Sequence, residues 1–260
     1  SFTLACPGAT AFTSSGSGTA TATLNPSGNL PVGATCTVTV LAAGIADVDT
    51  IDPPDNMAAP YVFTFTPVNT APTSTNDTAT TNEDATLLLA AGDFGTYADA
   101  DLDAFAGVRI STLESAGDLE FDSTGAGAWV DVTLNQDVIA AHLAAGRLRF
   151  VPDADATGSP YATIGFRVSD GIDVSIAAYT LSIDVLAAND APVITVPGAQ
   201  TTNEDTTHAV VGTSIADSDA GASPIEVQLA ATNGTLTLAG TTGLAFTTGD
   251  GTADSTMTFS

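Results

Sequence analysis

The side chains best suited to binding a ligand in this chain are aspartates spaced two residues apart. One run contains Asp99, Asp101 and Asp103, and a second contains Asp217 and Asp219. Calcium takes about six to eight oxygen ligands from carboxylates, amide side chains and backbone carbonyls, so such runs supply the atoms that a calcium site needs. Neither run has the downstream bidentate Glu of an EF-hand loop. We therefore expect calcium sites of another kind at these two loops.

The same aspartates also have a purely structural interpretation. Asp and Asn favour turns and caps because their side chains bond to their own backbone. Carboxylates gathered in one place, however, repel one another unless a cation lies among them. Zinc is not expected, since the two histidines, His142 and His208, are far apart in the sequence and have no cysteine nearby. Calcium is thus the expected metal, and turn formation is the alternative.

No combination of residues indicates a catalytic centre. Glu114 and Glu120 have the residue types of a glycosidase pair, but we interpret them as strand residues on a solvated face. His142 has no Ser or Cys nucleophile in a recognisable turn around it. Trp129 is interpreted as a core or edge-strand residue rather than a platform for a sugar. We therefore expect a protein without enzymatic activity.

The charge of the chain excludes one class of partner. Its 260 residues include 30 acidic side chains and only four basic ones, with a net charge of −26. Nucleic acid is excluded, because almost nothing could neutralise its phosphates. A hydrophobic content of 44% nevertheless permits a folded core, unlike an acidic disordered tail. No apolar run approaches the roughly 18 residues of a membrane span, so this segment is not expected to insert into a bilayer.

The two cysteines, Cys6 and Cys36, both lie near the start of the chain, next to runs with strand character. A disulfide between them would indicate an oxidising compartment and would stabilise the fold by about 3 to 4 kcal/mol in the chain-entropy model. Two buried free thiols are the alternative.

A sequence repeat divides the chain into modules. Residues 80–86 (TTNEDAT) return as residues 201–207 (TTNEDTT), and residues 69–72 (NTAP) return as residues 189–192 (NDAP). Both pairs have nearly the same offset, which has the length of one β-sandwich. Both ends of the chain have the pattern of a sequence cut from a longer protein, so the outer modules are expected to be incomplete. The expected modules are residues 1–69, 70–188 and 189–260.

Alternating apolar and polar residues predict antiparallel strands in all three modules, with β-branched residues in the runs and Gly, Asn and Asp between them. The sequence therefore predicts an all-β protein of tandem β-sandwiches. One short helix is expected at residues 137–145, where Val138, Ile139 and Leu143 are apolar and Gly146 follows. The clearest strand runs are residues 20–24, 36–40, 61–66, 107–110, 148–151, 164–168, 179–185, 195–196, 225–229 and 235–238.

Several short motifs follow one another in order in the second and third modules. They are residues 81–84 (TNED), 94–95 (FG), 99–103 (DADLD), 145–152 (AGRLRFVP), 166–171 (FRVSDG), 189–193 (NDAPV), 203–205 (NED), 215–221 (IADSDAG) and 249–251 (GDG). In this order and spacing the chain resembles the cadherin-like and related immunoglobulin-like repeats of bacterial adhesins and other extracellular proteins. Residues 41–43, 47–49 and 52–58 make the first module similar to another bacterial immunoglobulin-like type.

The resemblance implies calcium at the junctions between modules. In the family pattern, a Glu after the linker, an Asp-x-Asp loop and the Asn or Asp of the linker meet there. The first linker has Thr70 where the second has Asp190, so the first junction is expected to bind calcium more weakly or not at all. The implied ligands are Asn69, Glu83, Asp99, Asp101, Asp103 and Asp170 for the second module, and Asn189, Asp190, Glu204, Asp217 and Asp219 for the third.

The resemblance also implies a function: a non-catalytic structural or adhesive region of a secreted or cell-surface bacterial protein, with modules stiffened by calcium. Its expected partners are the neighbouring modules of the same protein, with self-association into a filament or layer as a further possibility. Two alternatives are open. The modules could accompany the catalytic domain of a secreted nuclease or hydrolase, or the acidity could be an adaptation to high salt in which calcium is incidental.

Overall fold

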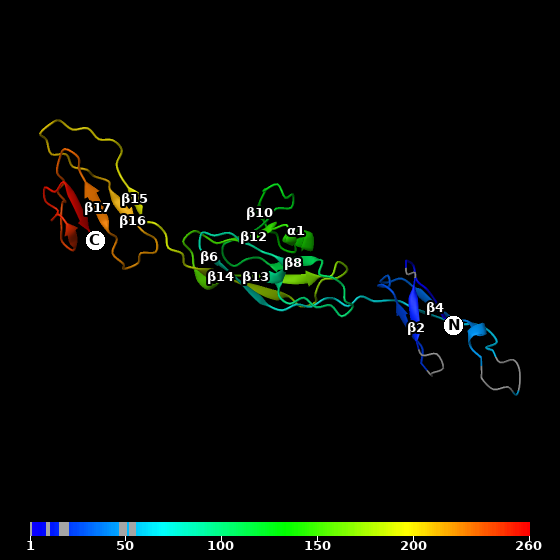
Figure 1. Cartoon of the computed structure of the whole chain (residues 1–260). Coiled ribbons are helices and arrows are strands. Elements are labelled where there is room, and N and C mark those ends of the chain that lie inside the picture. Colours follow the sequence, from blue (N-terminus) through cyan, green and yellow to red (C-terminus); the bar gives the residue numbers. More distant parts are fainter. Residues whose placement is uncertain (1, 9–10, 16–20, 47–50, 52–55) are drawn as a thin grey trace.

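Strands dominate the computed structural model, which describes residues 2–8, 11–15, 21–46, 51 and 56–260. Strands account for 39% of the structure and helices for 5%, so the expected all-β class with several sheets is confirmed. Figure 1 shows three groups of strands joined by extended segments. Residues 47–50 and 52–55, which carry part of the resemblance of the first module, lie outside the described residues.

The first module contains a three-stranded antiparallel sheet, in the order β1-β4-β5, and a separate hairpin of β2 and β3. One face of the sheet is apolar, because Leu4, Val38 and Phe63 lie opposite one another in the register, and threonines occupy the other face. The elements are β1 (Phe2–Ala5), β2 (Phe12–Ser15), β3 (Thr23–Pro26), β4 (Cys36–Val40), the 3-10 helix η1 (Ala42–Gly44) and β5 (Tyr61–Phe65).

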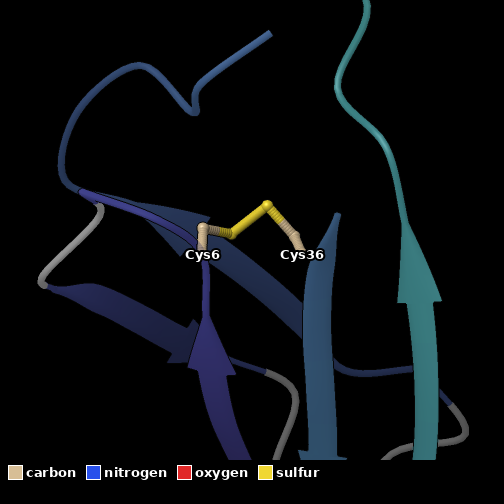
Figure 2. The surroundings of a disulfide bond; sticks show 2 residues. All are labelled: Cys6 and Cys36. Carbon is tan, nitrogen blue, oxygen red and sulfur yellow. A yellow bond between two sulfur atoms is a disulfide. The ribbon is translucent and has the colours of Figure 1, made fainter. Parts of the chain in front are cut away.

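A disulfide joins the end of β1 to the start of β4 (Figure 2). Cys6 follows the last residue of β1, and Cys36 is fully buried at the first position of β4. Their Cα atoms are 4.4 Å apart. Of the two alternatives that the sequence left open, the structure therefore contains the covalent bond.

The second module is a sandwich of two sheets, in the orders β11-β8-β13-β14-β6 and β10-β9-β12-β7. All pairings in it are antiparallel except that of β6, the first strand, which runs parallel to β14, the last. Its elements are β6 (Asp77–Asn82), β7 (Leu87–Leu88), η2 (Ala91–Phe94), β8 (Gly107–Thr112), β9 (Asp118–Phe121), β10 (Val130–Asp131), β11 (Asp137–Ile139), α1 (Ala140–Ala144), β12 (Leu148–Val151), β13 (Gly158–Ser169) and β14 (Tyr179–Leu186).

The core of the second module lies between these sheets and follows the alternation of the sequence. Along β13, Ala162, Ile164, Phe166 and Val168 are buried while the residues between them are not. Each fully buried Leu, Ile or Phe contributes about 1.5–3 kcal/mol relative to an exposed one. The other buried apolar residues are Ala79, Leu89, Phe94, Val108, Ile110, Leu119, Phe121, Val132, Val138, Leu143, Leu148, Phe150, Leu181, Ile183 and Val185.

The helix expected at residues 137–145 is shorter than the sequence indicates. Residues Asp137–Ile139 form β11, where Val138 pairs with Val108, and the helix comprises only Ala140–Ala144. The prediction was wrong at its start because Val138, a β-branched residue, gains more from pairing at the edge of the sheet than from a helical turn.

The third module has less buried apolar surface. Its elements are β15 (Val193–Thr195), β16 (Ser214–Ala216), β17 (Val227–Ala230), β18 (Phe246–Thr248) and β19 (Thr256–Phe259). The strand expected at residues 235–238 is not formed as a continuous ladder: Leu236 makes an isolated bridge with Asp254, and Leu238 donates its amide to the carbonyl of Gly251 at 2.9 Å.

Each sheet is built from strands of one module. No strand lies between Thr66 and Pro72 or between Ala187 and Pro192, both of which the structure describes. The exact module boundaries remain a prediction. Among the described residues, no helix is long and apolar enough to cross a membrane.

Candidate metal centres

The fold brings three acidic or amide-bearing segments together at one end of the second module, which we call the first junction. Strand β13 ends at Ser169, which pairs with Gly107 at the start of β8. The turn after β13 and the loop before β8 are therefore neighbours, and Ala106 donates its amide to the carbonyl of Ser169 at 2.8 Å. The turn carries Asp170, and the loop carries the run from Asp99 to Asp103.

Asn69 of the linker is held by the turn after β13. Its Nδ2 donates to Asp170 Oδ2 at 2.8 Å and to Asp173 Oδ2 at 2.9 Å. Its Oδ1 is shielded from solvent and has no hydrogen-bond partner. A buried acceptor without a partner is uncommon and is costly, so this oxygen lacks a donor or a cation.

Asp99 organises the loop that it begins. Its Oδ1 accepts the backbone amides of Asp101 at 2.8 Å and Asp103 at 3.1 Å, while Leu102 between them has a left-handed φ of 66°. These bonds are those of a turn-forming aspartate, as the structural interpretation expects. The second oxygen, Oδ2, is buried without a partner, which turn formation does not explain.

The linker also contacts the aspartate loop directly. Asp101 Oδ2 accepts the backbone amide of Thr70 at 2.6 Å. This hydrogen bond uses the backbone amide of residue 70, so it does not depend on the side chain. Thr70 therefore makes it, although the second linker has an aspartate, Asp190, at the equivalent position. Asp103 Oδ1 accepts a hydrogen bond of 2.6 Å from Asn29 of the first module.

The electrostatics of the first junction follow from this concentration of carboxylates. Burial, and then the charges of Asp99, Asp170 and Asp103, raise the pKa of Tyr97 to about 12. Burial alone would raise the pKa of Asp170, but the hydrogen bond from Asn69 and those from backbone amides outweigh it and lower the pKa. The group therefore stays ionised at neutral pH.

The donor set at the first junction fits calcium. Its ligand atoms are carboxylate and amide oxygens, which calcium prefers, and no sulfur or imidazole is near in the sequence. Among the described residues, the ion pairs are Arg109 with Asp137 and Arg149 with Glu120, so no basic side chain neutralises this junction. The candidate ligands are Asn69, Asp99, Asp101, Asp103, Asp170 and Asp173, although among the described residues no three of these carboxylates place one oxygen each within 4.8 Å of one another.

Glu83 does not lie with these residues. It follows the last residue of β6, which runs parallel to β14, and its amide bonds to the carbonyl of Leu186 at the end of that strand. It is only 6% exposed, and its Oε1 accepts the amide of Ala188 at 2.8 Å. The grouping of Glu83 with Asp99 was wrong, because a strand of six residues separates the two ends of the sheet. Glu83 instead faces the next linker.

The opposite end of the second module, with the linker after it and the Asp217 loop, forms the second junction. Asp190 donates its amide to Asp219 Oδ2 at 3.0 Å and accepts the hydroxyl of Ser218 at 2.9 Å. Asp217 Oδ1 accepts the amides of Asp219 at 3.3 Å and Ala220 at 2.9 Å. Hydrogen bonding to Asp217 and to the amide of Asp190 lowers the pKa of Asp219. The linker and the aspartate loop thus meet here as well.

Two residues of this junction were missed from the sequence. One carboxylate oxygen each of Asp84, Asp155 and Asp190 lies within 4.8 Å of the others, a spacing that could hold a metal ion. Asp84 is the last residue of the NED motif, and Asp153 and Asp155 form an Asp-x-Asp run that was overlooked. Asp84 and Asp155 are exposed and Asp190 is half-buried, so this cluster is open to solvent.

Of the five predicted ligands of the third module, only Asp190 belongs to this cluster, and Asp217 and Asp219 lie in the loop that contacts Asp190. Asn189 uses its Nδ2 to bond to the carbonyl of Asp190 at 2.7 Å, next to the cluster but directed at the main chain. Glu204 is exposed in a turn, where its backbone carbonyl accepts the hydroxyl of Thr206 at 3.2 Å. Among the hydrogen bonds of the described residues, none joins Glu204 to Asp217 or Asp219.

Comparison with known proteins finds a similarity in the first module. Residues 1–67 match the family model of the bacterial Ig-like domain, which agrees with the sheet, the hairpin and the buried disulfide found there. This family is generally non-catalytic, and its members occur in bacterial surface proteins. The match ends before Asn69 and so includes none of the proposed ligands. None of the curated proteins matches the chain.

Proposed function

We propose that this chain is a non-catalytic structural region of a bacterial extracellular protein, in which calcium at the junctions fixes each module relative to the next. The Ig-like match of residues 1–67, the all-β architecture and the disulfide support this assignment, since disulfides persist in oxidising compartments. The acidic chain, with four basic residues, offers nothing to a nucleic acid.

One observation carries the calcium proposal: two buried oxygens without partners, Asn69 Oδ1 and Asp99 Oδ2, belong to the same junction. They come from segments far apart in the sequence, and both are expected ligands. Turn formation accounts for the other oxygen of Asp99 but leaves these two costly atoms unexplained. A bound cation is one partner that would satisfy each of these oxygens.

A bound calcium ion would supply positive charge among carboxylates that otherwise repel one another. The chain's own residues then determine the mechanical effect. Asn69 and Thr70 belong to the linker, whereas Asp170 and Asp101 belong to the second module, so ordering these contacts fixes the linker on the sandwich. Without the ion the repulsion among Asp99, Asp101 and Asp103 loosens the loop that receives the linker, and the joint flexes.

The extracellular medium sets the occupancy of such sites. Extracellular modules bind calcium with dissociation constants of about 10⁻⁴ to 10⁻³ M. Binding to the folded state alone adds about 1.4 kcal/mol of stability when calcium is at ten times the dissociation constant. The region would therefore be stiff outside the cell, as an adhesive or filament-forming protein requires.

Association with further copies is a second part of the proposal. Strand β5 lies at the edge of its sheet and carries Tyr61, Phe63 and Phe65, all exposed and without a charge among them. An uncharged edge strand offers free backbone groups to another strand. This surface supports a role for the first module in contacts with neighbouring modules or copies.

Small-angle X-ray scattering of residues 1–260 tests the proposal. Adding calcium to chelator-treated protein at fixed ionic strength is expected to lengthen the particle and raise its radius of gyration, whereas the same concentration of magnesium does so less, since magnesium prefers to keep its waters. Identical profiles with calcium and with chelator would contradict the proposal. A change that salt alone reproduces would support the adaptation to high salt instead.

A further inference from the structure

The first module contributes one loop to the first junction, the segment between β3 and β4. Asn29 in this loop donates from its Nδ2 to Asp103 Oδ1 at 2.6 Å. Four residues later, Gly33 donates its amide to the carbonyl of Pro67 at 2.9 Å. One loop of the first module thus contacts both the start of the linker and the aspartate loop of the second module.

These contacts leave little of the linker free. Pro67 is bonded to the first module, and Asn69 and Thr70 are bonded to the second. Only Val68 lies between them, with 79% of its surface exposed. A single residue cannot determine the angle between two modules, so the side-chain contact of Asn29 with Asp103, which bridges the joint beside the linker, becomes the second point of attachment.

We propose that Asn29 is the positioning residue through which the junction cation sets the orientation of the first module. Asp99 holds Asp103, because Asp99 Oδ1 accepts the backbone amide of Asp103 at 3.1 Å. The other oxygen of Asp99, Oδ2, has no hydrogen-bond partner and belongs to the proposed cation site. An ion bound by Asp99 orders the loop that Asp99 organises, and with it Asp103, the acceptor of Asn29. Without the ion these like charges spread apart, and the acceptor moves away from the first module.

Linkage makes the effect reciprocal, since docking of Asn29 and binding of the ion stabilise the same loop conformation. Removing the Asn29 side chain must therefore weaken calcium binding at the first junction as well as loosen the first module. Hydrogen bonds to ligand side chains commonly affect metal affinity in this way. The inference rests on the proposed calcium site and adds to it a coupling between the ion and one residue of the neighbouring module.

The test compares Asn29→Ala with Asn25→Ala in the full chain of 260 residues. Asn25 is an exposed asparagine on β3 of the same module, so its substitution removes the same side chain away from the joint. Residual dipolar couplings in weakly aligned samples report on each module separately, and two modules that move as one body share one alignment tensor. Calcium chloride and a chelator provide the two states, and calorimetry gives the calcium affinity.

With calcium, the wild-type and Asn25→Ala proteins are expected to show one shared alignment tensor for the first two modules. In Asn29→Ala, the magnitude of the tensor is expected to be smaller for the first module alone. The affinity at the first junction should fall by about two- to tenfold in Asn29→Ala, as for the loss of one ordinary hydrogen bond. Equal tensors and equal affinity in Asn29→Ala and Asn25→Ala would overturn the inference and leave the calcium site standing. If the wild-type protein binds no calcium, the proposed function fails, and the inference fails with it.

Discussion

The two junctions use similar residue types but enclose them differently. At the first, the linker Asn69 reaches the second module, and one oxygen each of Asn69 and Asp99 is shielded from solvent and has no hydrogen-bond partner, whereas Asp101 and Asp173 are exposed. At the second, one carboxylate oxygen each of Asp84, Asp155 and Asp190 lies within 4.8 Å of the others, and Asp84 and Asp155 are exposed. The difference indicates that the number of carboxylates near a linker does not by itself determine the calcium affinity of a site. Water and salt screen an open cluster, whereas an enclosed one is screened little.

The sequence alone favours the second junction, because Asp190 stands where the first linker has Thr70. The contacts favour the first. Thr70 takes part through its amide, so the missing carboxylate removes a charge but not the attachment of the linker. We therefore predict the reverse order of affinity, with the first junction binding calcium more tightly than the second.

Asp99→Asn should have the largest effect on this comparison. It removes the charge of a residue that carries an orphaned oxygen and organises its loop, so the calcium affinity of the first junction should fall on the order of 100-fold. Calorimetric titration of the full chain measures it. Asp131→Asn, on the exposed strand β10, loses the same charge away from both junctions and should leave both affinities unchanged. A small effect of Asp99→Asn would remove the basis for ranking the first junction above the second.

Asp190→Asn should affect only the second junction, and by less. Asp190 contributes to an open cluster with Asp84 and Asp155, so the loss should be about tenfold. Raising sodium chloride from about 0.1 to 1 M should weaken the second site more than the first, because exposed charges are screened over about 3 Å at the higher salt. Equal salt dependence at both sites would show that enclosure does not distinguish them.

Glu83→Ala tests whether Glu83 belongs to the second junction. The substitution leaves the amide of Ala188 without its acceptor, and we expect a loss of about 1 to 3 kcal/mol in the free energy of unfolding of the second module. Calcium affinity should fall at the second junction and stay the same at the first. Chemical denaturation measures the free energy of unfolding, and calorimetry measures the calcium affinities. A lower affinity at the first junction would support the grouping of Glu83 with Asp99 that the sequence indicated. Asp131→Ala, on the exposed strand β10 of the same module, serves as the control for loss of a carboxylate elsewhere.

The smallest expected effect is on how the stability of the calcium-free protein depends on pH. The pKa of Asp170 is lowered in the folded state, mainly by the hydrogen bond from Asn69 acting against burial. A lowered folded pKa adds stability above the unfolded pKa of about 3.9, and that stability is lost as the pH falls through the folded value. Between about pH 5 and 2, the free energy of unfolding in urea should therefore fall less in Asp170→Asn than in the wild type. An unchanged profile in the variant would mean that Asn69 does not stabilise the charged carboxylate.

Much of the local structure was predictable because it depends on neighbours in the sequence. The alternation of Ala162, Ile164, Phe166 and Val168 identified a buried strand, since a strand places every second residue on one face. Spacing also identified the Asp99 loop, because turn bonds join residues only two to four positions apart. At residues 137–139 the local pattern failed, since pairing of Val138 with Val108 depends on a distant strand.

The sequence by itself determined the kinds of atom available and their local geometry: oxygen ligands in short loops, strands with one apolar face, and two cysteines near the ends of strands. Only the tertiary structure decided which of these meet. The parallel pairing of β6 with β14 carries Glu83 to the second linker, and the turn after β13 brings Asp173 to Asn69. Asp155 reaches Asp84 across 71 positions. Such encounters depend on strand order and on the length of each strand, which long-range packing sets and which no short stretch of sequence contains.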